Sequence, residues 1–204
     1  MKINYKTIHE SLISKSSNYS ELKKQIYENG IIRLSKPKID FFSYVVKTII
    51  SQQISDNVAD SIWQKFCKYF EKNIPKLQKI KNVNFLRKTL KNIGISKKKN
   101  EYILNFYNSI VSKSINFNLL KAKNEDEIKK QLTSLKGIGN WTCDMILIFF
   151  LLRLNVFPEN DLVIEKVKKK ICLVEKKQIN FVKIYSPHLS ILSLHMWKMS
   201  KRIL

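Results

Sequence analysis

The chain has 204 residues, 44% of them apolar, which is enough to bury the core of one domain or of two closely joined lobes. Its 38 Lys and Arg against 16 Asp and Glu give a net charge of +22, which favours a polyanionic partner and excludes a protein that binds polycations through an acidic surface. Nucleic acid is the preferred partner on this ground. An anionic membrane or a merely solvated lysine surface would explain the same excess, so charge does not name the chemistry.

Cysteine usage and hydropathy exclude two further classes of protein. Cys67, Cys143 and Cys172 are odd in number and share no metal-ligand spacing, which indicates reduced thiols rather than a disulfide framework. The longest apolar run, residues 145–152, is far shorter than the roughly 20 residues that cross a bilayer. The N-terminus, MKINYKTIHE, lacks the apolar core of a signal peptide. We therefore expect an intracellular protein of the cytoplasm or nucleoid, or of the nucleus in a eukaryote.

The first half of the chain predicts helices. Apolar residues recur three and four positions apart in three segments, 41–49, 58–70 and 102–110. Between the first two of these segments, the polar stretch SQQIS predicts the start of a helix.

The second half of the chain adds two helices with clear start signals. Asn124 followed by Glu127 predicts a capping box that opens a helix running through Leu135. Asp161, before Leu162, Ile164 and Val167, predicts the start of another helix. Strand signals are weak, because hairpin dipeptides and sustained alternation are both missing. The sequence therefore predicts an all-α fold, with residues 1–204 forming a single domain.

The stretch LKGIGNWTCD holds two of the four glycines in the chain, Gly137 and Gly139. The pattern predicts two helices joined by a very tight hairpin, the second helix beginning at Asn140 or Trp141. Both glycines permit positive φ and close approach of another backbone, and the freed N–H groups would form an anion site beside Lys136. A helix-ending glycine followed by a sharp turn is the simpler alternative.

Residues 135–166, LKGIGNWTCDMILIFFLLRLNVFPENDLVIEK, resemble the helix-hairpin-helix (HhH-GPD) base-excision DNA glycosylases, and within them the 3-methyladenine DNA glycosylase II group. Three further stretches are similar to segments of that family: IISQQIS at 49–55, IGISKKKNEYI at 93–103 and SLHMW at 193–197. The resemblance extends from about residue 40 to the C-terminus. By comparison with the family, the ~35 residues before Phe41 are too short for the extra N-terminal domain of some members and are expected to form one or two helices that pack with the C-terminal segment. The resemblance implies two helical lobes with a DNA-binding cleft and a helix-hairpin-helix at about residues 124–152.

The resemblance also implies an activity. It indicates a monofunctional glycosylase that hydrolyses the N-glycosidic bond of alkylated purines, such as N3-methyladenine, in duplex DNA during base excision repair. Asp161 is the implied catalytic carboxylate, and a role as helix N-cap is compatible because a helix N-terminus stabilises negative charge. A fixed anion would lower the barrier to an oxocarbenium-like transition state. Orienting or deprotonating the attacking water is an equally open role for Asp161.

Before its glycosidic bond is hydrolysed, a base must leave the duplex and enter a binding pocket. By position in the motifs, Trp141 and Trp197 correspond to the pocket aromatics of the family, and a cationic alkylated base would stack well on such rings. Met145 lies one helical turn beyond Trp141, where relatives often carry an aromatic residue, so it departs from the pattern. Ordinary core packing is the alternative for each of these side chains.

Gln53, with Gln52 and Ser55, matches the position from which the family inserts a plug into the DNA stack. Taken alone, these residues are a polar helix start. The full set expected to bind DNA is Gln52, Gln53, Ser55, Lys136, Gly137, Ile138, Gly139 and Asn140.

Two departures from the family's other patterns bear on the chemistry. Relatives with lyase activity carry a Lys two residues after the second hairpin glycine, where this chain has Trp141, so no lyase activity is expected. Relatives with an iron-sulfur cluster need four cysteines near the C-terminus, so no cluster is expected here. No cofactor is required. The backbone carbonyls of Thr133, Leu135 and Ile138 match positions that hold a monovalent cation in the family, Na+ or K+.

The expected partner is double-stranded damaged DNA. We expect the protein to bind it as a monomer and not to associate with a membrane. His9, His188 and His195 lack ligand-like spacing and are expected to be ordinary surface or packing residues. Two alternatives stay open. One is a non-catalytic helix-hairpin-helix DNA-binding protein, and the other is a glycosylase of different base specificity.

Overall fold

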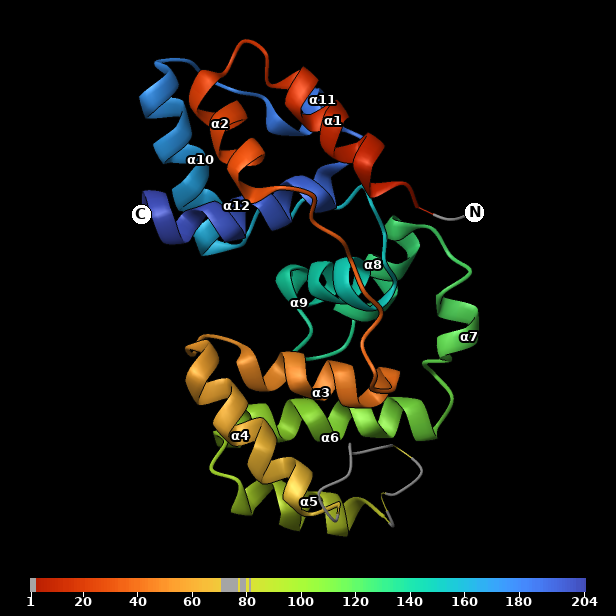
Figure 1. The fold of residues 1–204 in the computed structure, drawn as a ribbon. Helices are drawn as coiled ribbons and strands as arrows, with labels where there is room; N and C mark the ends of the chain where they lie inside the picture. The colour runs from red at the N-terminus through yellow and green to blue at the C-terminus, as the bar shows by residue number, and fades with distance from the viewer. Residues whose placement is uncertain (1–2, 71–76, 78–79, 81) are drawn as a thin grey trace. The chain divides into compact units, whose positions relative to one another are not determined.

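Regular structure is entirely helical in the described part of the chain. The structure, a computed structural model, describes residues 3–70, 77, 80 and 82–204. Figure 1 shows helices connected by loops, and no strand occurs within those residues. The predicted all-α fold is confirmed. None of the described helices is both long enough and apolar enough to span a bilayer.

The chain divides into two compact units. The first unit combines Met1–Ser35 with Leu147–Leu204, so the N-terminal segment folds with the C-terminal one. Its helices are α1 (Tyr5–Lys15), α2 (Ser20–Asn29), α10 (Leu162–Glu175), α11 (Phe181–Tyr185) and α12 (Leu189–Ile203). The second unit is Lys36–Ile146. Its helices are α3 (Phe41–Ser51), α4 (Asp56–Lys68), α5 (Val83–Asn92), α6 (Lys97–Val111), α7 (Phe117–Leu120), α8 (Glu125–Thr133) and α9 (Asn140–Met145).

Helix α3 forms the centre of the second unit. Its sequence, FFSYVVKTIIS, is apolar on most sides, and it packs against α4, α6 and α9. Asp40 caps its start by accepting a hydrogen bond from the backbone N–H of Ser43 at 2.8 Å. The rings of Phe42 and Phe106 stack at 5.9 Å between α3 and α6. Through its contacts with α9, α3 positions the glycine hairpin that precedes α9.

The core of the first unit lies among α2, α10 and α12, which pack against one another. Each helix contributes an apolar stripe at helical spacing, as Ile164, Val167 and Ile171 do from α10. These three side chains are fully buried. Burial of several such side chains, at roughly 1.5–3 kcal/mol each, holds α10 in place and thereby its first residue and cap.

A histidine lies inside this apolar core. His195, on α12, is fully buried and stacks on His9 at 5.6 Å. Its Nδ1 pairs with the side-chain amide of Asn29 at 3.1 Å. Burial, with smaller contributions from His9 and Lys198, lowers the pKa of His195 from 6.5 to about 3. The imidazole is therefore a neutral packing residue, as the sequence predicted.

Acid should destabilise the first unit through this histidine. Because its pKa is lower in the folded than in the unfolded state, unfolded chain binds one more proton between about pH 6.5 and pH 3. The contribution of neutral His195 to the free energy of unfolding is fully present above pH 6.5. It falls as the pH drops towards 3, by up to about 1.4 kcal/mol per pH unit. Denaturant unfolding from about pH 7 to about pH 5 measures this slope. His195→Gln should flatten it, and an identical slope in both proteins would contradict the assignment.

Several predicted helix boundaries need correction. The capping box at Asn124 and Glu127 is present, but α8 ends at Thr133 instead of continuing through Leu135. The N–H of Leu135 instead bonds the carbonyl of Leu132 at 3.1 Å, a tighter turn that begins the hairpin. Helix α4 starts at Asp56 and ends at Lys68, so Phe70 lies beyond it. Its core contact comes from a turn after the helix.

Candidate nucleic-acid interface and active site

The two glycines of the hairpin between α8 and α9 differ in backbone conformation and in their surroundings. Gly137 has a φ of +97°, and a Cβ at this position would overlap the ring of Tyr102. Gly139 has a φ of −91° and caps α9, with open space where a Cβ would stand. Of the two glycines that permit positive φ, only Gly137 adopts it. Gly139 instead keeps the outer side of the turn open to an approaching group.

The hairpin exposes its basic and polar residues and buries its apolar one. Lys136, Gly139 and Asn140 are exposed, and Asn140 is the first residue of α9, as predicted. Ile138 is buried at 3% exposure, so only its backbone is in a position to meet a ligand. The N–H of Ile138 closes the turn onto the carbonyl of Leu135 at 3.0 Å. An anion would meet Lys136 and the backbone around Gly139.

A partly buried ion pair joins the two helices of the hairpin. Lys129 on α8 lies 2.8 Å from the carboxylate of Asp144 on α9; the Asp144 side chain is only 3% exposed, and that of Lys129 is 35% exposed. Removing Lys129 would take away the ammonium charge that compensates the buried carboxylate. The pair locks the crossing of α8 and α9 and thereby the shape of the turn.

The SQQIS segment lies against this hairpin. The side-chain amide of Gln52 donates to the carbonyl of Gly137 at 3.0 Å and to the hydroxyl of Thr142 at 2.9 Å. Gln53 is exposed and has a φ of +57°, a conformation that residues other than glycine rarely adopt. Ser55 is exposed at the start of α4. Gln52 thus points into the protein, which favours a positioning role for it, while Gln53 and Ser55 face solvent.

Asp161 caps α10 in the first unit and is buried at 8% exposure. Its Oδ1 accepts hydrogen bonds from the backbone N–H groups of Val163 at 3.0 Å and Ile164 at 2.9 Å. The indole N–H of Trp197 donates to the same oxygen at 3.1 Å. Three N–H donors and the helix N-terminus stabilise negative charge on this carboxylate and fix its orientation.

A second aromatic ring packs on Trp197. The ring of Phe149 packs on Trp197 with centroids 5.7 Å apart. Phe149 comes from η2 (Ile146–Phe150), a π-helical turn, and it is partly exposed while Phe150 next to it is buried. Sequence reasoning missed Phe149, because inside the apolar run ILIFFLL nothing distinguishes a residue that faces a site from its core neighbours. Asp161, Trp197 and Phe149 form one cluster, which we call the carboxylate cluster.

Trp141 and Met145 belong to the second unit, and the carboxylate cluster belongs to the first. Trp141 is partly exposed on α9. Met145 is buried at 7% exposure, and its carbonyl accepts a hydrogen bond from the hydroxyl of Tyr44 at 3.1 Å. A pocket that combines these two residues with Trp197, and the cleft expected around it, stay predictions.

The carbonyls expected to hold a monovalent cation lie in and beside the hairpin turn. The Leu135 carbonyl accepts the Ile138 N–H and keeps a second lone pair, so it is compatible with a cation ligand. Within the described residues, His, Cys, Asp and Glu side chains form no group of three that could hold a metal. The three cysteines are free thiols.

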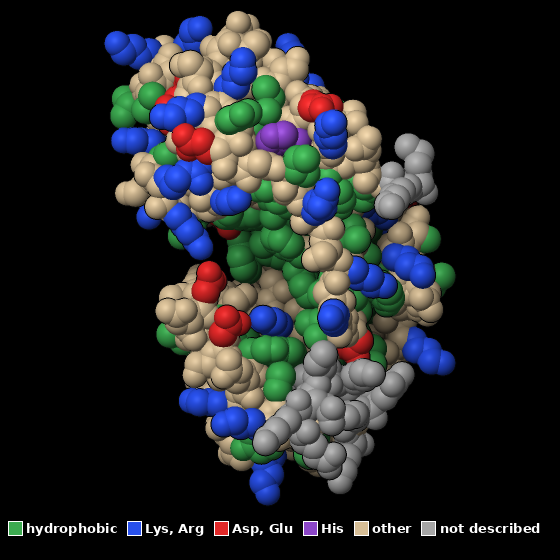
Figure 2. All heavy atoms as spheres, in the orientation of Figure 1, with side chains coloured by type: hydrophobic (Ala, Val, Ile, Leu, Met, Phe, Trp, Pro, Cys, Tyr) green, Lys and Arg blue, Asp and Glu red, His purple; other side chains and the backbone are tan. Residues whose placement is uncertain are grey.

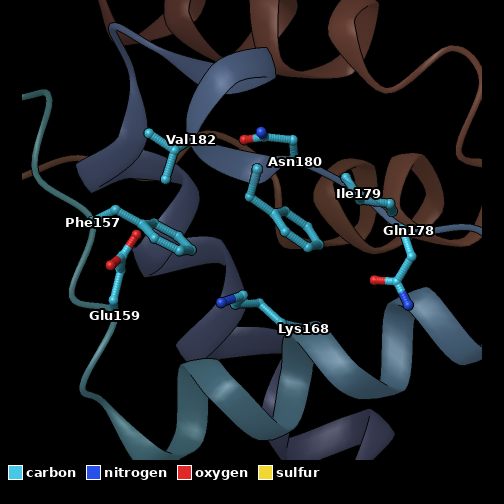
Figure 3. Close-up of a pocket in the computed structure, with 8 residues that line it drawn as sticks. Phe157, Glu159, Lys168, Gln178, Ile179, Asn180 and Val182 are labelled. Carbon is cyan, nitrogen blue, oxygen red and sulfur yellow. The ribbon is translucent and has the colours of Figure 1, made fainter.

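A surface pocket of about 380 Å³ also lies in the first unit (Figure 3). It is lined by Phe157, Glu159, Lys168, Gln178, Ile179, Asn180, Phe181 and Val182. Lys168 extends from α10 over the ring of Phe157 at 5.7 Å and pairs with Glu165 at 2.6 Å. The predicted site residues are all absent from this lining, so the pocket is separate from the carboxylate cluster.

Comparison with known proteins decides the family. Residues 46–182 match the HhH-GPD superfamily, described as base excision DNA repair proteins. The chain belongs to this superfamily. The match contains both the hairpin and Asp161, while Trp197 lies beyond it.

One HhH-GPD relative is the alkylbase DNA glycosidase-like protein mag2 of Schizosaccharomyces pombe. It is 28% identical over 97% of this chain and 94% of its own length. Two solved structures share the fold. The 3-methyladenine DNA glycosylase of S. pombe, in complex with abasic DNA, is 23% identical with a TM-score of 0.77 over 96% of this chain and 97% of that one. The 8-oxoguanine glycosylase/lyase of Clostridium acetobutylicum, in complex with double-stranded DNA, is 18% identical with a TM-score of 0.76, over 99% and 72% of the two chains.

The surface charge suits a DNA repair protein of this superfamily. In each unit, basic residues outnumber acidic ones by more than two to one. Figure 2 shows Lys and Arg side chains spread over the visible face of both units, with fewer acidic side chains among them. The basic excess therefore does not depend on the hairpin alone.

Proposed function

We propose that the chain is a monofunctional DNA glycosylase that hydrolyses the N-glycosidic bond of alkylated purines, such as N3-methyladenine, in duplex DNA. The observation that carries the proposal is the carboxylate cluster, in which Asp161 is held by three N–H groups beside aromatic rings. Capping α10 accounts for the two backbone N–H contacts of Asp161, whereas the indole N–H of Trp197 and the aromatic rings beside it are additional features that a base-excising site would require. The products would be a free base and an abasic site.

Asp161 would act on the deoxyribose side of the bond. Departure of the base builds positive oxocarbenium character on the sugar, and a fixed carboxylate lowers the free energy of that transition state. Water then adds to the sugar carbon, and its proton passes to solvent or to Asp161. Because the N–H groups around Oδ1 are already aligned, the protein has no need to reorganise as charge develops.

Hydrolysis without strand cleavage is the proposed outcome because of Trp141. A lyase step requires an amine that attacks the sugar carbon and forms a Schiff base. The family's lyase position carries Trp141 here, whose indole nitrogen is not a nucleophile. This residue supports a monofunctional enzyme.

Alkylated purines are the proposed substrates because they are cationic. A base methylated at N3 carries positive charge and a weakened glycosidic bond, so it leaves with modest help. The faces of Trp197 and Phe149 would attract such a ring through cation–π interaction, worth about 0.5–2 kcal/mol. The name of the S. pombe relative mag2, an alkylbase DNA glycosidase-like protein, points to the same substrate class.

A base-release assay tests the proposal. Wild-type protein is incubated with duplexes that contain N3-methyladenine, N7-methylguanine, 8-oxoguanine or no lesion, and free bases are separated by chromatography. We expect release from the methylated duplexes and intact strands until alkali cleaves the abasic sites. Direct strand cleavage would contradict the monofunctional assignment, release from 8-oxoguanine alone would favour the different base specificity, and release from no lesion would support the non-catalytic DNA-binding protein.

Lys136→Glu tests the hairpin as a phosphate site. Lys136 is exposed, so the substitution should leave the fold intact and weaken binding to all duplex sequences alike. The slope of log affinity against log salt should also become flatter, because fewer counterions are released. Fluorescence titration at several salt concentrations measures both effects. Lys183→Glu, the same charge change at an exposed position of α11, is the matched control, and an equal effect there would refute a specific role for the hairpin.

The remaining proposals concern partners. The protein would bind damaged duplex DNA as a monomer inside the cell. The carbonyls of Thr133, Leu135 and Ile138 would hold a Na+ or K+ ion that links the hairpin to a DNA phosphate, without a part in the bond cleavage. Replacing K+ by a bulky organic cation at equal ionic strength would then weaken DNA binding.

A further inference from the structure

The first turn of α6 contains three consecutive lysines, Lys97, Lys98 and Lys99. Basic residues are unfavourable at this end of a helix. The N-terminus of a helix bears partial positive charge, so acidic residues stabilise this end and basic residues oppose it. Local stability therefore does not explain the lysines. Lys97 and Lys98 are exposed, whereas Lys99 is partly buried.

Lys99 has a partner at the opposite kind of helix end. Its ammonium group donates a hydrogen bond to the backbone carbonyl of Ile50 at 2.7 Å. Ile50 lies in the last turn of α3, where carbonyls lack partners within the helix and the partial charge is negative. Burial lowers the pKa of Lys99 below its usual value. The lysine thus caps α3 directly before the turn that holds Gln53.

The same face of α6 also supports the hairpin. Tyr102, three residues after Lys99, packs on Gly137 so closely that the glycine has no room for a Cβ. One helix face therefore contacts both segments that are expected to meet DNA. The two segments are also joined directly, because Gln52 bonds the carbonyl of Gly137. All of these contacts lie within the second unit.

We propose that Lys99 is a positioning residue, which fixes the end of α3 so that the Gln53 turn is held at a set place relative to the hairpin. The proposal rests on the proposed function, since a preset turn matters to a protein that must fill the gap left by an extruded base. Gln53 has a left-handed backbone conformation that needs support from its surroundings. Lys99 supports the turn from the side of α3, and Gln52 supports it from the side of the hairpin.

The test compares three variants. Lys99→Met keeps the length of the side chain and removes its charge and hydrogen bond. Lys97→Met, in the same helical turn but exposed, removes the same charge and is the matched control. Lys99→Arg restores a cationic donor. For each variant, amide hydrogen exchange at Gln52, whose N–H bonds the carbonyl of Ile49 at 3.3 Å at the end of α3, is measured in the free protein. Affinity for undamaged duplex and single-turnover release of N3-methyladenine are measured as well.

We expect Lys99→Met to speed exchange at the Gln52 amide and to slow base release by about tenfold each, since the charge-assisted hydrogen bond that holds the end of α3 is lost. Its affinity for undamaged duplex should stay within about twofold of that of Lys97→Met, because both variants lose one charge. Lys99→Arg should recover most of both effects. A general loss of folding would instead raise exchange throughout α3 and α6 and lower duplex affinity as well.

The outcome that overturns the proposal is exchange and release in Lys99→Met equal to those of Lys97→Met. Failure of Lys99→Arg to recover either effect counts against it too. If the wild-type protein releases no base from any lesion, the proposed function fails. The exchange arm of the test still decides whether Lys99 holds the turn, so the two failures are distinguishable.

Discussion

Asp161→Asn is expected to lower single-turnover release of N3-methyladenine at least about 100-fold, which corresponds to about 2.7 kcal/mol of lost transition-state stabilisation. Asparagine keeps a side-chain oxygen that accepts from the N–H groups of Val163 and Ile164, so the cap of α10 survives. Trp197 still has an acceptor for its indole N–H. The variant therefore removes the negative charge and little else.

The control for this prediction is Asp40→Asn. Asp40 caps α3 in the same manner, by accepting the N–H of Ser43, and lies in the other unit. Its variant should release base at the wild-type rate. Thermal unfolding of Asp161→Asn should stay close to that of the wild type, because only the charge–dipole interaction at the start of α10, about 0.3–1 kcal/mol, is lost. Its duplex affinity should not fall. Release that survives in Asp161→Asn would remove this residue from the mechanism, even if the protein remains a glycosylase.

Gly137→Ala is expected to have the largest effect on the structure of the hairpin. An L-residue at a φ of +97° costs roughly 1–2 kcal/mol, and its Cβ would overlap the ring of Tyr102. Tyr102 or the turn must move, which also breaks the bond between Gln52 and the carbonyl of Gly137. We expect a loss of more than about 2 kcal/mol in the free energy of unfolding and a fall of at least about tenfold in duplex affinity.

Two other glycines separate the causes of that effect. Gly94 has a φ of +80° but open space around a Cβ, so Gly94→Ala should show the backbone cost alone, roughly 1 kcal/mol. Gly139 has neither positive φ nor a close neighbour, so Gly139→Ala should leave stability within about 0.5 kcal/mol while still weakening DNA binding at the exposed turn. Equal unfolding free energies for Gly137→Ala and Gly139→Ala would contradict the assigned packing of Tyr102.

Much of the fold could be predicted from local sequence signals. The capping box at Asn124, the cap at Asp161 and the start of α9 at Asn140 were predicted because caps and turns depend on residues within four positions of one another. Tertiary contacts decided what these local signals left open. The sequence shows two alike glycines and not which one packs against Tyr102, so it did not show that Gly137, and not Gly139, adopts positive φ.

The sequence by itself determined that this protein is helical, strongly basic and built around a glycine hairpin, because helix periodicity, charge and turn chemistry are properties of short stretches. Only the tertiary structure decided which groups act together. Trp197 reaches Asp161 across 36 residues, and Gln52 reaches Gly137 across 85. Such pairings arise when packed cores bring distant helix faces together. No spacing along the chain encodes them.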